Sequence, residues 1–273
     1  MSKELRRIVL ITLICLAVMA AALALAAPGH GATPKTKLLV HAGAGIRPAL
    51  DEAGAAFEKQ TGIQVEYNYK GSGCLLPDVL MSEQGDVYLP GEIYYMKQAV
   101  DRKIVKPNYK VVATMSTMLI VPVDNPKHIH TVQDLAKPGV QVGLGDIKAV
   151  AVGRAAKEVL TKAGVWDKVQ KNVTMMGQNV SELGNAVKLG QLDGSIVWNA
   201  TCSLYTAREV TRIAIPAKYS VTVPVPVGVV KFSKHGAEAQ RYLDFLASPA
   251  GKAIFVKHGF GPPPAAKPKA KGK

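Results

Sequence analysis

Short apolar runs and amphipathic stretches alternate along the chain from about residue 38 to residue 261. The short runs are rich in β-branched and aromatic residues, and most lead through a glycine-containing turn into apolar residues at helical spacing. Strands are expected at 38–41, 64–69, 86–89, 140–144, 173–176, 194–198 and 211–215. Helices are expected near 47–61, 75–83, 93–104, 131–135, 152–162, 180–189, 236–247 and 249–258. This alternation predicts an α/β fold with a largely parallel sheet.

Two longer extended runs, at 111–122 and 221–230, flank the middle set of strand–helix units. The simplest topology that uses them has two α/β lobes, with the second inserted into the first and the two runs crossing between them. We therefore expect a first lobe formed by 37–117 and 222–261 and a second lobe formed by 118–221. A hinge of this kind closes on a ligand held between the lobes.

The N-terminus has the pattern of an export signal. Lys3, Arg6 and Arg7 precede an apolar, uncharged run at 8–27, and alanines are frequent at its end. We expect residues 1–32 to be a cleaved signal peptide and the protein to be periplasmic. The competing interpretation is an uncleaved membrane anchor, because a run of about 20 apolar residues can span a bilayer.

The formal net charge of +14 is partly carried by the two ends of the chain. Lysines alternate with proline, alanine and glycine at 262–273, which predicts a disordered basic tail. Contact of this tail with anionic lipid or a partner, and a solvated tail without a role, are both open. So basic a chain is typical of nucleic-acid-binding proteins, but export argues against that partner. We expect a monomer that binds no nucleic acid.

The candidate chemistry lies at turns between a strand and a helix. The tripeptide Gly71-Ser72-Gly73 would place free N–H groups and one hydroxyl at the positive end of a helix, although it is also an ordinary tight turn. Comparable turns occur at 43–45, 151–153 and 178–180, so each predicted lobe supplies two. Because ligands of α/β sheets bind beyond the carboxyl ends of the strands, the turns predict one site for a negative ligand.

Cys74 and Cys202 are the cysteines that remain once residues 1–32 are removed, and each follows a predicted turn of the cleft. A disulfide bond between them would hold the cleft shut or bias its opening. Two separate thiols are the other interpretation, and the sequence leaves both open.

Several stretches, taken in their order along the chain, resemble one family of transport proteins. They are 56–62 (AFEKQTG), 71–73 (GSG), 85–88 (GDVY), 156–160 (AKEVL) and 255–260 (FVKHGF). From Leu38 to about Gly261 the chain is similar to the periplasmic molybdate- and tungstate-binding proteins of ABC importers. The resemblance implies a two-lobed type II periplasmic-binding-protein fold and no enzymatic activity. It also implies a molybdate or tungstate ion held without a cofactor and delivered to an ABC permease in the inner membrane.

The resemblance also assigns binding residues. Ser72 lies where the family has a binding serine, and Val152 and Val180 lie where it binds the anion with backbone N–H groups. Gly45 stands where a second serine is usual, and Trp198 stands where many members have a tyrosine. The expected ligand-binding residues are Ala44, Gly45, Gly71, Ser72, Gly73, Val152, Val180 and Trp198.

Alternatives to this assignment follow from the same residues. The two lost hydroxyls leave open a different small anion, namely sulfate, phosphate or a small carboxylate. An exported enzyme that uses the same cleft is the alternative from another class. Arg47 and Lys148 lie near two of the turns, where they would either add charge or remain solvated cations at helix ends. Asn199 is a further candidate donor.

Two weaker patterns favour structural roles. His128 and His130 have the spacing of two metal ligands on one strand face, but no cysteine or clear carboxylate accompanies them, so a surface loop is favoured. Asp86 and Glu92 have the residue types of a carboxylate pair, but we expect Asp86 to fix the loop at the end of its strand.

Overall fold

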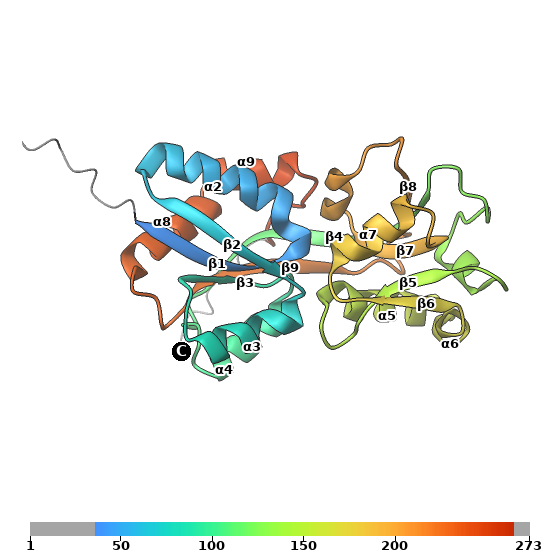
Figure 1. The fold of residues 1–273 in the computed structure, drawn as a ribbon, viewed down its shortest axis with the longest axis horizontal. Helices are drawn as coiled ribbons and strands as arrows, with labels where there is room; N and C mark the ends of the chain where they lie inside the picture. Colours follow the sequence, from blue (N-terminus) through green and yellow to red (C-terminus); the bar gives the residue numbers. More distant parts are fainter. Residues whose placement is uncertain (1–35, 265–273) are drawn as a thin grey trace, which may run out of the picture. The chain divides into compact units, whose positions relative to one another are not determined.

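The computed structural model describes residues 36–264, which form alternating strands and helices (Figure 1). The predicted signal peptide and residues 265–273 of the predicted basic tail lie outside the described residues. The strands are β1 (Lys37–Gly43), β2 (Gln64–Lys70), β3 (Val87–Leu89), β4 (Lys110–Pro122), β5 (Val142–Gly145), β6 (Val173–Gly177), β7 (Gly194–Trp198), β8 (Val210–Ala214) and β9 (Thr222–Val229). The α-helices are α2 (Arg47–Thr61), α3 (Ser72–Ser82), α4 (Ile93–Asp101), α5 (Ala151–Lys162), α6 (Trp166–Gln170), α7 (Val180–Lys188), α8 (Gly236–Ala247) and α9 (Pro249–Lys257). The 3-10 helices are η1 (Ala44–Ile46), η2 (Val132–Ala136) and η3 (Ala200–Leu204).

Local sequence signals set several of these boundaries. Helix α2 ends at Gly62, whose φ of 74° lies in the left-handed region that glycine adopts without strain. Helix α9 begins with Pro249, and the hydroxyl of Ser248 before it accepts a hydrogen bond from the N–H of Gly251 at 3.2 Å. The predicted alternation of strands and helices is confirmed. Helix α6 and η3 were not predicted, because five residues are too few to show a helical period.

The sheet is mixed, with the order β2-β1-β3-β9-β4-β7-β5-β6 and with β8 paired to β4. Strand β1 pairs in parallel with β2 and β3, which together form the first strand group. Strand β5 pairs in parallel with β6 and β7, which together form the second strand group. The antiparallel pairs all involve β4 or β9. The sheet is therefore parallel within each group, and the two long strands make the whole mixed.

Strand β4 pairs with β7 of the second group and with β9, which in turn pairs with β3 of the first group (Figure 1). Its residues from Lys110 to Ser116 pair with β9, whereas those from Thr117 onward pair with β7 and β8. The partner therefore changes between Ser116 and Thr117. The division into lobes at 117/118 and 221/222 stays a prediction. The change of partner in β4 lies one residue before the predicted boundary at 117/118.

The helices cover the faces of the sheet and bury a large apolar core, with a second, smaller apolar cluster around α3 and α4. Figure 1 shows α2, α8 and α9 on one side of the first strand group and α3 and α4 on the other. In α2 the buried residues are Ala49, Leu50, Ala53, Gly54 and Phe57, which form one stripe at helical spacing. Within residues 36–264 no helix is long and apolar enough to cross a membrane.

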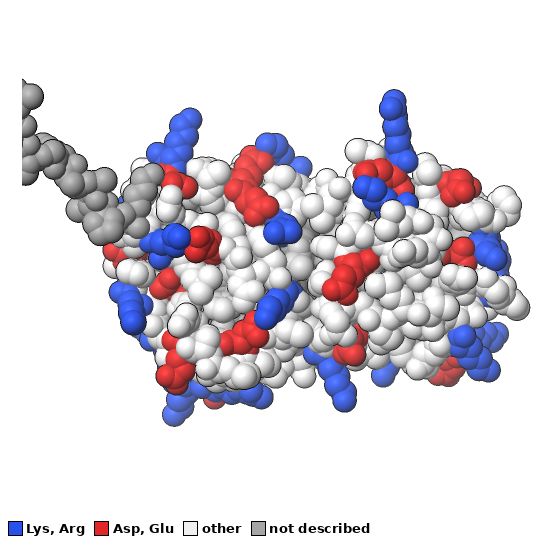
Figure 2. All heavy atoms as spheres, viewed as in Figure 1, with Lys and Arg blue, Asp and Glu red and all other residues white. Residues whose placement is uncertain are grey.

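Charged side chains of both signs are interspersed on the face shown in Figure 2. Many form exposed ion pairs, such as Lys37 with Glu66 at 2.8 Å and Lys257 with Glu52 at 2.8 Å. Each pair of this kind adds little to stability. On this face the positive charge is not gathered into one patch, and the expected absence of a nucleic-acid partner stays a prediction.

Candidate functional site

A small cavity lies between the first and second strand groups, where the starts of several helices meet. The space within the cavity that the centre of a water molecule can occupy is about 20 Å³. The cavity therefore admits a water molecule or a small ion and not a large organic molecule. Its lining consists of Gly43, Ala44, Gly45, Ile46, Lys70, Gly71, Ser72, Gly91, Met115, Val150, Ala151, Val180 and Trp198. None of these residues is an aspartate or a glutamate, so the lining adds no negative side chain.

Backbone N–H groups at the starts of α3, α5 and α7 remain without acceptors beside this cavity. An α-helix leaves its first N–H groups without a partner inside the helix. Several of these groups bond elsewhere, namely those of Gly73, Cys74, Gly153, Ser181 and Glu182. The others have no acceptor within residues 36–264, and they belong to Ser72, Ala151, Val152 and Val180. Together with the helix dipoles, these free donors make the cavity favourable for an anion.

The hydroxyl of Ser72 is oriented by its neighbour Gly91. Ser72 is the first residue of α3 and is buried, and its Oγ accepts a hydrogen bond from the N–H of Gly91 at 2.9 Å. A hydroxyl can accept and donate at the same time, and this contact occupies only its acceptor side. The proton of Ser72 is therefore available to a ligand in the cavity.

The two glycines beside Ser72 allow the backbones of the two strand groups to approach closely. A Cβ atom at position 71 would overlap the carbonyl oxygen of Gln178 and lie 2.7 Å from that of Ala149. At position 73 it would overlap the carbonyl oxygen of Lys148 and lie 2.8 Å from Cα of Ala149. The N–H of Gly73 donates to the carbonyl of Ala149 at 2.8 Å. The Gly-Ser-Gly sequence therefore supplies both a donor to the cavity and a direct contact across it.

Gly45 and Trp198 lie against one another in the wall of the cavity. A Cβ atom at position 45 would lie 3.1 Å from Cδ1 of Trp198, 3.1 Å from Cγ1 of Val180 and 3.2 Å from Oγ1 of Thr201. Side-chain contacts this short require the neighbours to move. The indole of Trp198 thus borders the space that a serine at position 45 would use, so the two departures from the family pattern are spatially coupled.

A family model described as bacterial extracellular solute-binding protein matches residues 38–261 of this sequence. The chain belongs to this family. The match covers the strands and helices that build the cavity, from β1 to the end of α9. The structure also has the two-lobed periplasmic-binding-protein fold expected from the sequence.

Individual relatives of this solute-binding protein are distant. A lipoprotein of Bacillus subtilis, YvgL, provisionally named as the substrate-binding component of an ABC transporter, is 28% identical over 230 residues, which are 83% of this chain and 86% of that protein. The molybdate-binding protein ModA of Haemophilus influenzae is 26% identical over 249 residues, 88% of this chain and 95% of ModA. The structure of the periplasmic molybdate-binding protein of Azotobacter vinelandii superimposes with a TM-score of 0.74 at 18% identity, covering 83% of this chain and 99% of that one.

The cavity of this solute-binding protein brings together most of the residues expected from the sequence. Ala44, Gly45, Gly71, Ser72, Val180 and Trp198 line it. Val152 is fully buried one residue beyond the lining residue Ala151, and Gly73 faces the carbonyl groups across the cleft. Gly43 and Ala151 lie in the predicted turns 43–45 and 151–153, although they were not named as binding residues. The lining residues outside the predicted turns are Ile46, Lys70, Gly91, Met115 and Val150. A glycine shortly after a predicted strand end was the available signal for Gly91.

The cations near the turns have other partners or face solvent. Arg47 lies 3.8 Å from Asp51 and above the ring of Tyr69, and the exposed Lys148 does not line the cavity. The side chain of Asn199 joins two segments, because it accepts from the N–H of Ser116 at 2.9 Å and donates to the carbonyl of Gly259 at 2.7 Å. Arg47 and Asn199 therefore have partners within the protein and Lys148 faces solvent, so none of the three side chains needs a ligand to explain its position.

Both cysteines of the described part are free thiols. Cys74 is half-buried, whereas Cys202 is buried and its Sγ donates to the carbonyl of Trp198 at 3.7 Å. Burial raises the pKa of the Cys202 thiol to about 11. A neutral, buried thiol is a packing group rather than a nucleophile.

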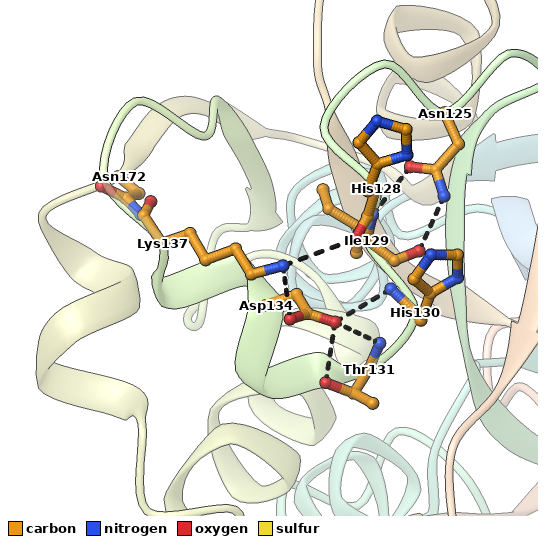
Figure 3. A network of polar contacts seen from close by, with 8 residues as sticks. All are labelled: Asn125, His128, Ile129, His130, Thr131, Asp134, Lys137 and Asn172. Carbon is orange, nitrogen blue, oxygen red and sulfur yellow. Dashed lines mark hydrogen bonds and ion pairs between the residues drawn. The ribbon is translucent and has the colours of Figure 1, made fainter.

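The segment with His128 and His130 is a hydrogen-bonded surface loop (Figure 3). Both histidines are exposed, and residues 36–264 contain no group of three or more side chains that could hold a metal ion. The side chain of Asn125 pairs with the N–H and the carbonyl of Ile129, each at 2.9 Å. Asp134 accepts from the N–H groups of His130 and Thr131 at 2.9 and 2.8 Å. The favoured interpretation of this segment as a loop is confirmed.

Asp134→Asn is expected to destabilise the protein by about 1–3 kcal/mol, because it removes the ion pair with Lys137 and weakens charge-assisted hydrogen bonds. Burial alone would raise the pKa of Asp134, but Lys137 and the donors of His130 and Thr131 together hold it well below its usual value. A depressed pKa in the folded state gives stability that is present above the unfolded pKa of about 3.9 and is lost as the pH falls below it. Urea denaturation of both proteins at pH 7 and pH 3 measures this, and an equal difference at both pH values would contradict it.

The two candidate carboxylates have separate roles. Asp86 accepts from the N–H of Leu39 at 2.8 Å and from the hydroxyl of Ser233 at 2.7 Å, so it fixes the loop before β3 as expected. Glu92 lies 3.5 Å from Nε of Arg154 in α5, and burial raises its pKa against the opposing effect of this arginine. The Arg154 guanidinium also lies 3.7 Å above the ring centre of Tyr94. This contact joins the start of α4 to α5.

Proposed function

We propose that this chain is the extracytoplasmic solute-binding protein of an ABC importer and that it captures molybdate or tungstate between its two lobes. The observation that carries the proposal is the set of free N–H groups and the Ser72 hydroxyl beside a small cavity without an acidic lining residue. The molybdate-binding relative supports the choice of ligand. The protein works in the periplasm as a monomer after removal of residues 1–32, and its partner is an ABC permease in the inner membrane.

The donors act without a buried counter-charge. Several directed hydrogen bonds share the cost of removing a compact anion from water, and the helix dipoles add to them. Ala44, Gly45, Ser72, Val152 and Val180 contribute N–H groups, and Trp198 contributes its indole N–H. None of the lining residues is an aspartate or a glutamate that could accept a proton from the ligand, so the wall favours an oxyanion that carries no proton of its own. Phosphate, which is partly protonated at neutral pH, is therefore a poorer ligand.

Closure of the lobes completes the site. The first lobe, 37–117 with 222–261, brings the N–H groups of η1 and α3, and the second lobe, 118–221, brings those of α5 and α7. The strands β4 and β9 act as the hinge, and the bond from Gly73 to Ala149 forms on closure. The anion then lies between donors of both lobes and out of contact with bulk water.

Sulfate is the second candidate, because Gly45 provides no hydroxyl and Trp198 narrows the wall beside it. A smaller anion with the same charge and shape would be held by the remaining donors. Sulfate, like molybdate, carries no proton at neutral pH, so the selection against phosphate is the same for both.

We expect molybdate or tungstate to raise the melting temperature of the purified protein, and phosphate and small carboxylates to leave it unchanged. Binding to the folded state stabilises it by RT ln(1 + [L]/Kd), about 2.7 kcal/mol at a hundredfold excess over Kd. A thermal-shift screen against these ions and sulfate measures it. A shift with sulfate alone would select the second candidate. The absence of a shift with any oxyanion would overturn the proposal, and turnover of an anionic substrate would identify an enzyme instead.

A further inference from the structure

An ion pair joins the first turn of α5 to the loop before α4. Nε of Arg154 lies 3.5 Å from Oε1 of Glu92, and the two residues belong to different lobes of the predicted division. The side chain of Glu92 is only 11% exposed, and that of Arg154 is 37% exposed. Nε of Arg154 is itself buried and has no hydrogen-bond partner within residues 36–264. Both charges have lost much of their water, so each depends on the other for compensation.

The orientation of Arg154 is fixed by a second contact. Its guanidinium lies 3.7 Å above the ring centre of Tyr94, in the first turn of α4, and a planar cation is attracted to the face of such a ring. Glu158, one turn further along α5, pairs with Lys162 at 2.7 Å and not with Arg154. The charge and the plane of the guanidinium are therefore both directed at the segment that begins α4.

Both partners of the ion pair adjoin residues of the cavity. Glu92 follows Gly91, which lines the cavity and whose N–H donates to Oγ of Ser72 at 2.9 Å. Arg154 lies three residues after Ala151, which lines the cavity and has a free N–H group. A Cβ atom at position 91 would lie 3.2 Å from Oγ of Ser72 and 3.5 Å from Cβ of Ala151. The ion pair thus lies beside the place where Ser72 and the start of α5 meet.

We propose that Arg154 is a positioning residue for anion binding, because its pairing with Glu92 holds the free N–H groups of α5 against Ser72. The inference rests on the proposed function and deepens it. Without Arg154, closure of the lobes would bury the carboxylate of Glu92 without a counter-charge, whereas in the open protein water reaches it. The pair therefore stabilises the closed, ligand-bound protein and slows release of the anion.

The test separates release from capture. Arg154→Met, which keeps an apolar stem of similar length, is expected to weaken molybdate binding about tenfold or more. Calorimetric titration of the purified protein with sodium molybdate measures Kd, and stopped-flow fluorescence of the cavity residue Trp198 measures the association rate. The product of the two is the dissociation rate. We expect the dissociation rate to rise about tenfold or more and the association rate to fall by less than about threefold, since the loss of one exposed charge affects only the steering of the anion.

Lys157→Met is the matched control, because Lys157 removes the same charge from the same helix but lies 5.5 Å from the ring centre of Trp166 in α6. This variant is expected to show the same small change in association rate and the dissociation rate of the parent. A rise in the dissociation rate as large as that of Arg154→Met would show a general effect of charge and would overturn the inference.

A double-mutant cycle with Glu92→Gln tests the pairing itself. The Glu92→Gln, Arg154→Met double variant has no uncompensated carboxylate, so we expect it to bind molybdate at least about threefold more tightly than Arg154→Met alone. Melting temperatures without ligand are expected to stay close to that of the parent. An unchanged dissociation rate of Arg154→Met, a double variant as weak as the product of the two single losses, or a lower melting temperature with unchanged affinity would overturn the inference. Absence of oxyanion binding by the parent protein would instead overturn the proposed function on which it rests.

Discussion

Gly73→Ala is expected to weaken molybdate binding about a hundredfold or more without unfolding the protein. The added Cβ would overlap the carbonyl oxygen of Lys148 and lie 2.8 Å from Cα of Ala149. Both neighbours are backbone atoms, which cannot rotate away as the end of a flexible side chain can. In the proposed mechanism, closure of the lobes brings this pair of backbones together, and we therefore expect the substitution to act on closure.

We do not expect the same substitution to destabilise the open protein. Position 73 lies in the first turn of α3, and alanine is a better helix former than glycine by about 1 kcal/mol. The loss therefore comes from the contact across the cleft and from the bond of the Gly73 N–H to Ala149. Apparent affinity falls in proportion to the closed fraction, and a hundredfold fall corresponds to about 2.8 kcal/mol.

Gly236→Ala is the matched control, because Gly236 also begins a helix, α8, and a Cβ atom there would meet no atom within 4 Å. Titration calorimetry measures the affinity of both variants, and small-angle X-ray scattering in the presence of molybdate measures the radius of gyration. We expect Gly73→Ala to keep the larger radius of an open protein and Gly236→Ala to behave as the parent. Parent-like affinity of Gly73→Ala would show that the cleft tolerates the methyl group.

The sequence could predict features that depend on neighbours along the chain. The start of α3 after β2 follows from an alternating run, a glycine turn and a helical period, which all lie within about twenty residues. The extended run at 111–122 was also visible, and it agrees with β4 at Lys110–Pro122. Its pairing was not visible, because β4 changes its partner from β9 to β7 and β8 in the middle of the strand. A local pattern predicts a strand but not the strand beside it.

The residues of the site can also be divided into those that a local pattern could place and those that only the fold brings together. Ser72 and Gly71 could be placed in it from a local turn, and the structure brings both to the cavity. The spacing role of Gly73 depends on residues 148 and 149, which are distant in sequence, so the glycine was interpreted as one more donor. Gly45 and Trp198 were visible only as two separate departures from a family pattern. Their mutual contact required the fold.

Ser72→Ala is expected to weaken molybdate binding by about 1.5–3 kcal/mol, or roughly ten- to a hundredfold, because the anion loses a hydrogen bond from a hydroxyl that no neighbour replaces. The substitution also leaves the N–H of Gly91 without its acceptor, so the melting temperature without ligand falls too. The two effects are separable, because calorimetry well below the melting temperature reports affinity alone.

Ser82→Ala is the control for Ser72→Ala, since Ser82 ends the same helix and its hydroxyl donates to the carbonyl of Asp78 at 2.7 Å on the exposed side. We expect this control to keep the parent affinity. If Ser72→Ala lowers the melting temperature but leaves the affinity unchanged, the hydroxyl serves only to hold Gly91, and the tripeptide is a tight turn. If both fall, one hydroxyl does both tasks: its acceptor side fixes the loop after β3, and this contact aims its proton at the anion.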